Sequence, residues 1–239
     1  MIYVTGDTHG NQRLWEICFS SFLEEGDTLI VLGDFGIGFF DNTYRTEEMF
    51  YDYISEKNYR ILFCDGNHEN FEKLNHYNVT MWNGGRVQMI RNNLIHLMRG
   101  EVYEIEGKKI FVMGGGYSID KAIRVPGETW WPDEMPSDEE YQNASENLRK
   151  CEYKVDYILT HTAPNDTVEY MSRIGKGIKN NVYEEMQLTG FLRWIQDVTE
   201  YQNWFFGHFH IDAELWKNQY ALLDAIRDLH TGEIVKMRG

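Results

Sequence analysis

Residues 2–10 read IYVTGDTHG, a short apolar run that passes directly into a small polar loop. The same arrangement returns twice in the first third of the chain, as TLIVLGDFG at 28–36 and RILFCDGNHE at 60–69. Short apolar runs bounded by glycine and small polar residues are typical of buried strands. Helical stretches near 12–22 and 45–56 separate the runs, so this part of the chain is predicted to form βαβ units with a parallel sheet.

The polar loops after these strands are predicted to meet at one place. Ligands of open α/β sheets bind outside the carboxyl ends of the strands, and each loop follows such an end. YILTH at 157–161 and NWFFGHFH at 203–210 repeat the pattern later in the chain. Between them we predict an amphipathic helix near 184–198, whose apolar face carries Leu188, Phe191, Leu192 and Ile195.

The middle of the chain has a different pattern of apolar and polar residues. Apolar runs at 94–98, 101–106 and 109–113 are predicted to form a short meander. The stretch at about 117–147, called the excursion, carries three of the four prolines, two adjacent tryptophans and many acids. Long ordered loops are usually functional, so we expect a lid with some helix towards its end. Further strands are predicted near 213–216, 220–224 and 233–237.

Composition limits the class of protein. The chain has 239 residues, 42% of them hydrophobic, and a net charge of −15. This length fits a single domain over residues 1–239, and no apolar run is long enough to span a bilayer. The acidic balance disfavours binding to long nucleic acids, so binding a phosphate ester requires local cations. Three widely spaced cysteines, Cys18, Cys64 and Cys151, fit a reducing cytosol, and we expect a cytoplasmic protein without a membrane partner.

The polar loops are rich in side chains that bind transition metals. These side chains are Asp7, His9, Asp34, Asn67, His161, His208 and His210. Asp7 and His9 are two residues apart in extended chain, so both can reach one ion, and the last two histidines repeat this spacing. Carboxylate and imidazole together suit manganese, iron or zinc better than calcium. The histidines outside the loops, His76, His96 and His230, are interpreted as structural.

The blocks GDTHG, GDFG, GNHE, the strand-end His161 and GHFH resemble, in this order, the calcineurin-like metallophosphoesterase superfamily. The resemblance runs from Asp7 to His210 and implies an α/β fold, a four-layer αββα sandwich of two mixed β-sheets. It also implies a dinuclear metal site at the C-terminal rim of the strands. By this resemblance one ion is held by Asp7, His9 and His210, the other by Asn67, His161 and His208, and Asp34 bridges them. The implied cofactor is two divalent metal ions, manganese first, with iron, zinc, cobalt, nickel or magnesium as alternatives.

The activity implied by the resemblance is hydrolysis of phosphate esters. Two divalent ions lower the pKa of a bridging water and clamp the phosphoryl oxygens, so that hydroxide attacks phosphorus. The catalytic residues are then Asp34, as the bridge, and His68, which binds no metal and protonates the leaving oxygen. Glu69 or Asp65 is expected to orient His68, and the alternative for Glu69 is a purely structural role.

The substrate-binding residues are sought in and near the excursion. No basic residue stands between Asp34 and Arg45, where the protein serine/threonine phosphatases carry a phosphate-binding arginine, so that assignment is disfavoured. The candidates for binding phosphate are Arg124, Lys121 and Arg99, because arginine above all suits bidentate phosphate recognition. Trp130 and Trp131 can stack on a planar group or, alternatively, pin the excursion to the body.

These features leave more than one function open. We expect a phosphomonoesterase acting on a small phosphorylated metabolite or nucleotide. The alternative is a phosphodiesterase acting on cyclic or short nucleotides. A non-catalytic metal-binding interaction module is disfavoured, because such a protein should have lost a ligand and none is missing here. The sequence does not determine the oligomeric state.

Overall fold

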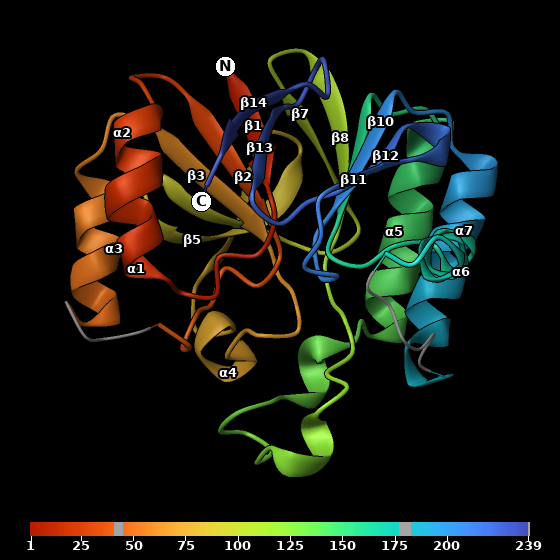
Figure 1. The fold of residues 1–239 in the computed structure, drawn as a ribbon, viewed down its shortest axis with the longest axis horizontal. Helices are drawn as coiled ribbons and strands as arrows, with labels where there is room; N and C mark the ends of the chain where they lie inside the picture. The colour runs from red at the N-terminus through yellow and green to blue at the C-terminus, as the bar shows by residue number, and fades with distance from the viewer. Residues whose placement is uncertain (41–44, 177–182, 239) are drawn as a thin grey trace.

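The computed structural model describes residues 1–40, 45–176 and 183–238, and its strands form two mixed sheets packed face to face (Figure 1). The eight-stranded sheet has the order β14 (Ile234–Met237), β13 (Ala225–Asp228), β1 (Ile2–Thr5), β2 (Thr28–Leu32), β3 (Arg60–Cys64), β6 (Leu94–Leu97), β5 (Gly85–Arg91) and β4 (Val79–Trp82). The six-stranded sheet has the order β11 (Ala213–Leu215), β12 (Gln219–Ala221), β10 (Asn203–Phe206), β9 (Tyr157–Thr160), β8 (Lys108–Met113) and β7 (Glu101–Ile105).

The first three strands form the parallel centre of the larger sheet, as predicted. Val4 of β1 pairs with Ile30 of β2, which in turn pairs with Leu62 of β3. All of β2 is buried, as expected for a parallel strand covered on both faces. A helical run connects β1 to β2, and α3 (Glu47–Ser55) precedes β3. The run consists of α1 (Gln12–Leu14), the π-helical turn η1 (Trp15–Phe19) and α2 (Ser20–Phe22).

Helices cover the outer face of each sheet and complete four layers. The helices α1 to α3 lie against the larger sheet, and α5 (Asp138–Lys150), α6 (Asn165–Arg173) and α7 (Met186–Val198) lie against the smaller one (Figure 1). Leu29 of β2 packs towards the helices, whereas Ile30 packs between the sheets, because successive side chains of a strand point to opposite faces. The predicted αββα architecture is therefore confirmed, and so is the apolar face of α7.

The predicted meander is wrong, because its strands belong to different sheets. β6 pairs with β3 and β5 in the larger sheet, whereas β7 and β8 form a hairpin in the smaller one. Gly100, with a φ of 74°, lies between β6 and β7, where the chain crosses from one sheet to the other. Four further features were not predicted: the β4–β5 hairpin, β13, α6 and the short helix α4 (Phe71–Leu74).

The chain between β8 and α5 projects from the body (Figure 1). This part of the excursion contains two short 3₁₀ turns, η2 (Lys121–Ile123) and η3 (Pro132–Glu134). The predicted helix towards the end of the excursion is α5, which begins with a capping box formed by Ser137 and Glu140. Ala144 and Leu148 of α5 pack in the core beside the smaller sheet. The last third of the excursion therefore belongs to the body.

The described part of the chain has no helix that is both long and apolar enough to cross a membrane. All three cysteines are unpaired, with Cys18 and Cys64 buried and Cys151 half-buried.

Candidate metal centre

The predicted site residues lie in loops at the carboxyl ends of five strands. Asp7 follows β1, Asp34 follows β2, and Asn67 follows β3 in the larger sheet. His161 follows β9 and the GHFH loop follows β10 in the smaller sheet. Each set of strands runs parallel, so its loops emerge at one edge. A hydrogen bond of 2.8 Å from His161 Nδ1 to the carbonyl oxygen of Leu32 joins the two edges.

Asp7, His9, Asp34 and His210 form the first group of potential metal ligands. Each offers one ligand atom, and these atoms lie within 4.8 Å of one another. Asp7 Oδ2 is 3.1 Å from His210 Nε2, and His9 Nε2 is also 3.1 Å from His210 Nε2. The two carboxylates are buried, whereas the two histidines are partly exposed. The group therefore opens to solvent on its histidine side.

Asn67, His161 and His208 form a second group. His161 Nε2 is 3.1 Å from Asn67 Oδ1 and 3.2 Å from His208 Nδ1. Asp34 is close to both groups, because its Oδ1 is 3.5 Å from His161 Nε2 and its Oδ2 is 3.7 Å from His9 Nδ1. The structure thus brings the whole predicted ligand set together and places Asp34 between its two halves.

The donor atoms of both groups fit divalent cations. Asp7 Oδ2 is buried and makes no well-aligned hydrogen bond within the described residues, although His210 Nε2 is near. Such an oxygen is costly to bury unless a cation completes its surroundings. The facing imidazole nitrogens of each group can share at most one hydrogen. Their separations of 3.1 and 3.2 Å suit two ligands bound to one ion at about 2.1 Å.

The backbone of these loops is unusual in a way that brings the ligands together. Positive φ angles of 47°, 48°, 65° and 52° occur at His9, Asp34, His208 and His210. Such angles are uncommon outside glycine and cluster at functional sites. Glycines allow the close approach of loops: a Cβ on Gly33 would lie 2.0 Å from His161 Nδ1, and one on Gly207 would lie 2.3 Å from Asp7 Oδ1. The glycines beside the ligands are therefore required by packing.

The protonation states of Asp34, His9 and His208 favour metal binding, whereas at His161 and His210, whose pKa values are raised, a metal competes with a proton. Burial alone would raise the pKa of Asp34, but the nearby His161 and His68 outweigh it and hold that pKa well below its usual range. Burial lowers the pKa of His9 and of His208, so both imidazoles are neutral at neutral pH. Burial would also lower the pKa of His161, but the charge of Asp34 outweighs it and the pKa is raised. Ionised carboxylates and neutral imidazoles are the forms that bind metal.

His68 contacts Asp34, which lies between the two groups. Its backbone N–H donates to Asp34 Oδ1 at 2.7 Å, and its ring Nδ1 is 2.8 Å from Asp34 Oδ2. On its other side, Nη2 of Arg124 is 2.6 Å from Nε2. A guanidinium nitrogen can only donate, so Nε2 accepts and Nδ1 carries the hydrogen that points to Asp34.

The carboxylate that contacts His68 is Asp34, so the prediction that Glu69 or Asp65 orients this ring is wrong. Glu69 instead accepts hydrogen bonds from the backbone N–H groups of Phe35, Gly36 and Ile37. These bonds hold the loop that carries Asp34. The carboxylate of Asp65 accepts from His96 and Arg99 in the interior.

Among the predicted substrate ligands, Arg124 reaches the site. Its Nε is 2.7 Å from Asp120 Oδ1, and this pair directs the guanidinium towards His68. Lys121 points elsewhere, with its Nζ 3.7 Å from the centre of the Tyr117 ring and 4.9 Å from that of Trp130.

Arg99 is not placed to bind substrate, contrary to the prediction. The residue is 5% exposed, and its Nε donates to Asp65 Oδ2 at 2.8 Å. Its Nη2 donates to the carbonyl oxygen of Asp133 at 2.8 Å, and its Nη1 is 3.3 Å from Glu140 Oε2. Arg99 therefore ties the excursion and the start of α5 to the loop after β3.

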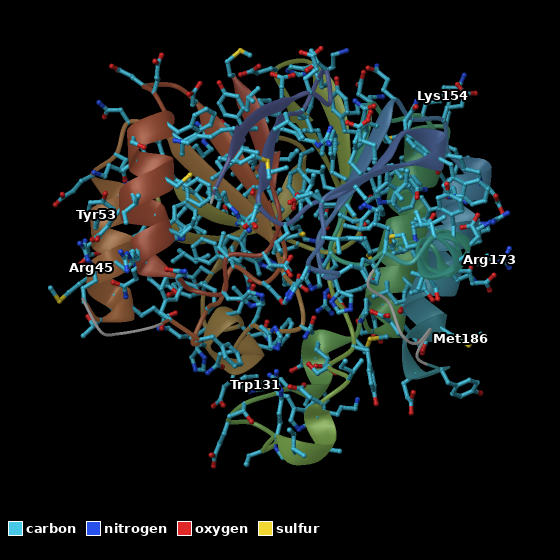
Figure 2. The ribbon with its side chains drawn as sticks, in the orientation of Figure 1. Arg45, Tyr53, Trp131, Lys154, Arg173 and Met186 are labelled. Carbon is cyan, nitrogen blue, oxygen red and sulfur yellow. The ribbon has the colours of Figure 1, made fainter. Side chains whose placement is uncertain are left out.

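The two tryptophans differ in burial. Trp131 is 5% exposed, belongs to the core beside the larger sheet and lies 5.7 Å from Phe39 between ring centres. It sits where the excursion meets the body (Figure 2). The alternative interpretation, that an aromatic residue pins the excursion, holds for Trp131, and its burial contradicts a role in stacking on substrate. Trp130 is half-buried under the Nζ of Lys121.

The remaining histidines have structural partners. His96 lies between Gln88 and Asp65, and His230 Nδ1 is 3.0 Å from the hydroxyl of Tyr157. The ring of His76 contacts the carbonyl oxygen of Glu72 in α4.

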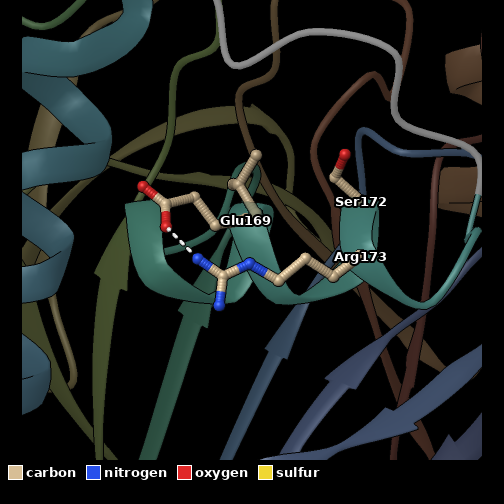
Figure 3. Close-up of a pocket in the computed structure, with 4 residues that line it drawn as sticks. Glu169, Ser172 and Arg173 are labelled. Carbon is tan, nitrogen blue, oxygen red and sulfur yellow. Dashed lines mark hydrogen bonds and ion pairs between the residues drawn. The ribbon is translucent and has the colours of Figure 1, made fainter.

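A hollow of about 230 Å³ on α6 contains none of the predicted ligands. It is lined by Val168, Glu169, Ser172 and Arg173, and an ion pair of 3.4 Å joins Arg173 to Glu169 (Figure 3). Since these two charges neutralise each other, the hollow has no group of side chains comparable to the potential metal ligands of the loops.

Two mixed sheets between layers of helices, with a cluster of aspartates and histidines at the strand ends, define the class of metallophosphoesterases. Residues 1–212 match the family model for calcineurin-like phosphoesterases. The chain belongs to this family and is a metal-dependent phosphoesterase. No curated protein matches the chain.

Proposed function

We propose that the protein is a phosphomonoesterase that acts on a small phosphorylated metabolite or nucleotide in the cytoplasm. The observation that carries this proposal is the position of Arg124, a cation from the excursion that lies 2.6 Å from His68 beside both ligand groups. A monoester exposes more terminal phosphoryl oxygens than a diester, and an arginine fork can bind two of them at once. The unpaired cysteines support the reducing compartment.

The ligand groups have separate roles in this proposal. Asp7, His9 and His210 would hold one ion, Asn67, His161 and His208 the other, and Asp34 both. When bound, two divalent ions, for which manganese is our first choice, supply activated water and neutralise phosphoryl charge. The protein net charge of −15 makes such neutralisation necessary, and it disfavours long polyanions as substrates.

The chain's own acid is His68. Asp34 accepts the hydrogen at Nδ1 and fixes the ring, so Nε2 is the atom that can pass a proton to the leaving oxygen. Nε2 is occupied by Arg124 in this structure. A phosphate group that draws the guanidinium to its own oxygens frees Nε2 to take up a proton from solvent, and the doubly protonated ring then gives this proton to the leaving oxygen. Asp120 keeps the arginine at the site during this exchange.

We expect manganese-dependent hydrolysis of 4-nitrophenyl phosphate that exceeds hydrolysis of bis(4-nitrophenyl) phosphate. The rates should be measured on the same protein, first stripped with a chelator and then reloaded with each candidate metal. A faster diester reaction would favour the phosphodiesterase alternative. A folded, manganese-loaded sample without activity on either ester would favour the non-catalytic module.

Removal of Arg124 should weaken monoester binding in particular. Hydrogen bonds to charged groups contribute about 1.5–3 kcal/mol, so Arg124→Ala should raise KM for the monoester roughly tenfold or more. The increase in KM for the diester should be smaller, because a diester has fewer terminal oxygens that Arg124 can bind. Arg173→Ala is the matched control, since it removes an exposed arginine paired with Glu169 on α6. Equal loss on both esters would contradict monoester recognition by Arg124.

A further inference from the structure

Glu185 is a buried acid beside the second ligand group that the chemistry above does not use. It ends the 3₁₀ turn η4 (Tyr183–Glu185), immediately before α7, and is 5% exposed. Its Oε1 is 3.4 Å from His208 Nε2 and accepts a hydrogen bond of 3.2 Å from the backbone N–H of Tyr117. A carboxylate held this close to a potential metal ligand can fix the orientation of that ligand.

The two nitrogens of His208 face different partners. Nδ1 faces His161 Nε2 at 3.2 Å and is the atom directed at the second ligand group. Nε2 points the other way, towards Glu185. An imidazole that binds a metal through one nitrogen presents the other as an N–H, and a carboxylate that accepts this hydrogen fixes the ring and its tautomer. Glu185 Oε1 is the carboxylate oxygen near this nitrogen, at 3.4 Å.

The neighbouring histidine is oriented by a different device. His161 Nδ1 donates to the carbonyl oxygen of Leu32 at 2.8 Å, which leaves Nε2 directed at Asn67 and His208. A backbone carbonyl of β2 therefore orients His161, whereas the group near Nε2 of His208 is the carboxylate of Glu185. The charge of Glu185 adds to this, because a carboxylate partner makes the imidazole a stronger ligand.

We propose that Glu185 is a positioning residue that orients His208 for the second metal ion. The inference depends on the proposed ligand set. Glu185 also connects His208 to the excursion, because it accepts a hydrogen bond from the backbone of Tyr117. The ring of Tyr117 in turn packs against Lys121 of η2, with 3.7 Å between Nζ and the ring centre. Arg124 directly follows η2 and reaches His68. Glu185 therefore contacts both His208 and the segment of the excursion that leads to Arg124.

The test is titration of the metal-free protein with Mn²⁺ by calorimetry. Glu185→Gln keeps an oxygen for the Tyr117 N–H but removes the charge that faces His208. We expect it to raise the dissociation constant of one of the two ions by about 10–100-fold and to leave the other unchanged. The thermal midpoint without metal should stay as in the wild type. Glu101→Gln, which alters a buried acid on β7 paired with Arg86, should change neither dissociation constant.

His208→Ala separates failure of this inference from failure of the ligand assignment. If His208→Ala lowers the affinity for one ion and Glu185→Gln does not, Glu185 has no positioning role. If neither variant changes either affinity, the proposed ligand set itself is wrong. A fall in both affinities for Glu185→Gln, together with a lower thermal midpoint, would show a structural role instead and overturn the inference.

Discussion

Asp34→Asn should reduce phosphoester hydrolysis by more than about 100-fold and lower the metal content from two ions per chain to one or none. Loss of a residue that only supports a ligand costs about 10–100-fold, and Asp34 stands closer to the chemistry than such a residue. It lies 3.5 Å from His161 and 3.7 Å from His9, so both ligand groups depend on it. It also contacts the ring of His68, so the same change disturbs the proposed acid.

The substitution is nearly isosteric, which makes the result interpretable. Asparagine keeps an oxygen that can accept the backbone N–H of His68, and it removes the charge that bridges the groups. Metal content should be measured by elemental analysis and the rate with the monoester described above. Asp156→Asn is the control, because that carboxylate pairs with Lys108 at the other end of the smaller sheet. A variant that keeps two ions and the wild-type rate would show that Asp34 is no bridge.

The proximity of the proposed ligands could be predicted because each of them follows a strand whose type is visible locally. Apolar runs such as residues 28–32 indicate parallel strands, and parallel strands bring their end loops together without further information. The two-residue spacing of Asp7 and His9 then predicts that their side chains point in the same direction. The proposed ligands required no knowledge of long-range packing beyond this rule.

The pairing of β6 and β7 could not be predicted in the same way. Both strands have the pattern of a half-buried or buried strand, and nothing in that pattern states which sheet a strand joins. The crossing is made at Gly100, which looks like an ordinary hairpin glycine in the sequence. The β4–β5 hairpin, in contrast, did carry a local signal that was overlooked. Asn83 and Gly84 have φ of 48° and 93°, as the common two-residue hairpin turn requires.

The substrate side of the site was harder to predict, because residue type alone does not reveal burial. Arginine and tryptophan suit both substrate binding and interior anchoring. Trp131 is in the core, and Arg124, from the same excursion, lies at the site. Glu185 was missed because the acids of residues 184 and 185 resemble any helix start. The signal that distinguishes them is the contact with His208, which appears only in three dimensions.

Arg99 is expected to stabilise the fold, and its removal should cause a large loss in the free energy of unfolding. Its guanidinium is paired with Asp65, and both side chains are almost fully buried, at 4% and 2% exposure. Removing one partner of a buried pair leaves an uncompensated charge and typically costs about 3–5 kcal/mol. Arg99→Ala should therefore lower the free energy of unfolding by about this amount, measured by urea titration of the metal-free protein. The double change Arg99→Leu with Asp65→Asn should cost less, because it leaves no buried charge.

The pH dependence of this loss distinguishes the buried charge from simple loss of packing. Burial alone would raise the pKa of Asp65, but Arg99 and His96 outweigh it and hold that pKa well below its usual range. A carboxyl with a lowered pKa in the folded state stabilises the fold above its unfolded pKa of about 3.9, and this contribution is lost as pH falls below that value. Without Arg99 the folded pKa rises, so protonation relieves the penalty. The difference in the free energy of unfolding between wild type and Arg99→Ala should shrink as pH is lowered from 7 towards 4. If Arg99 bound substrate instead, its removal would raise KM and leave the free energy of unfolding unchanged at every pH.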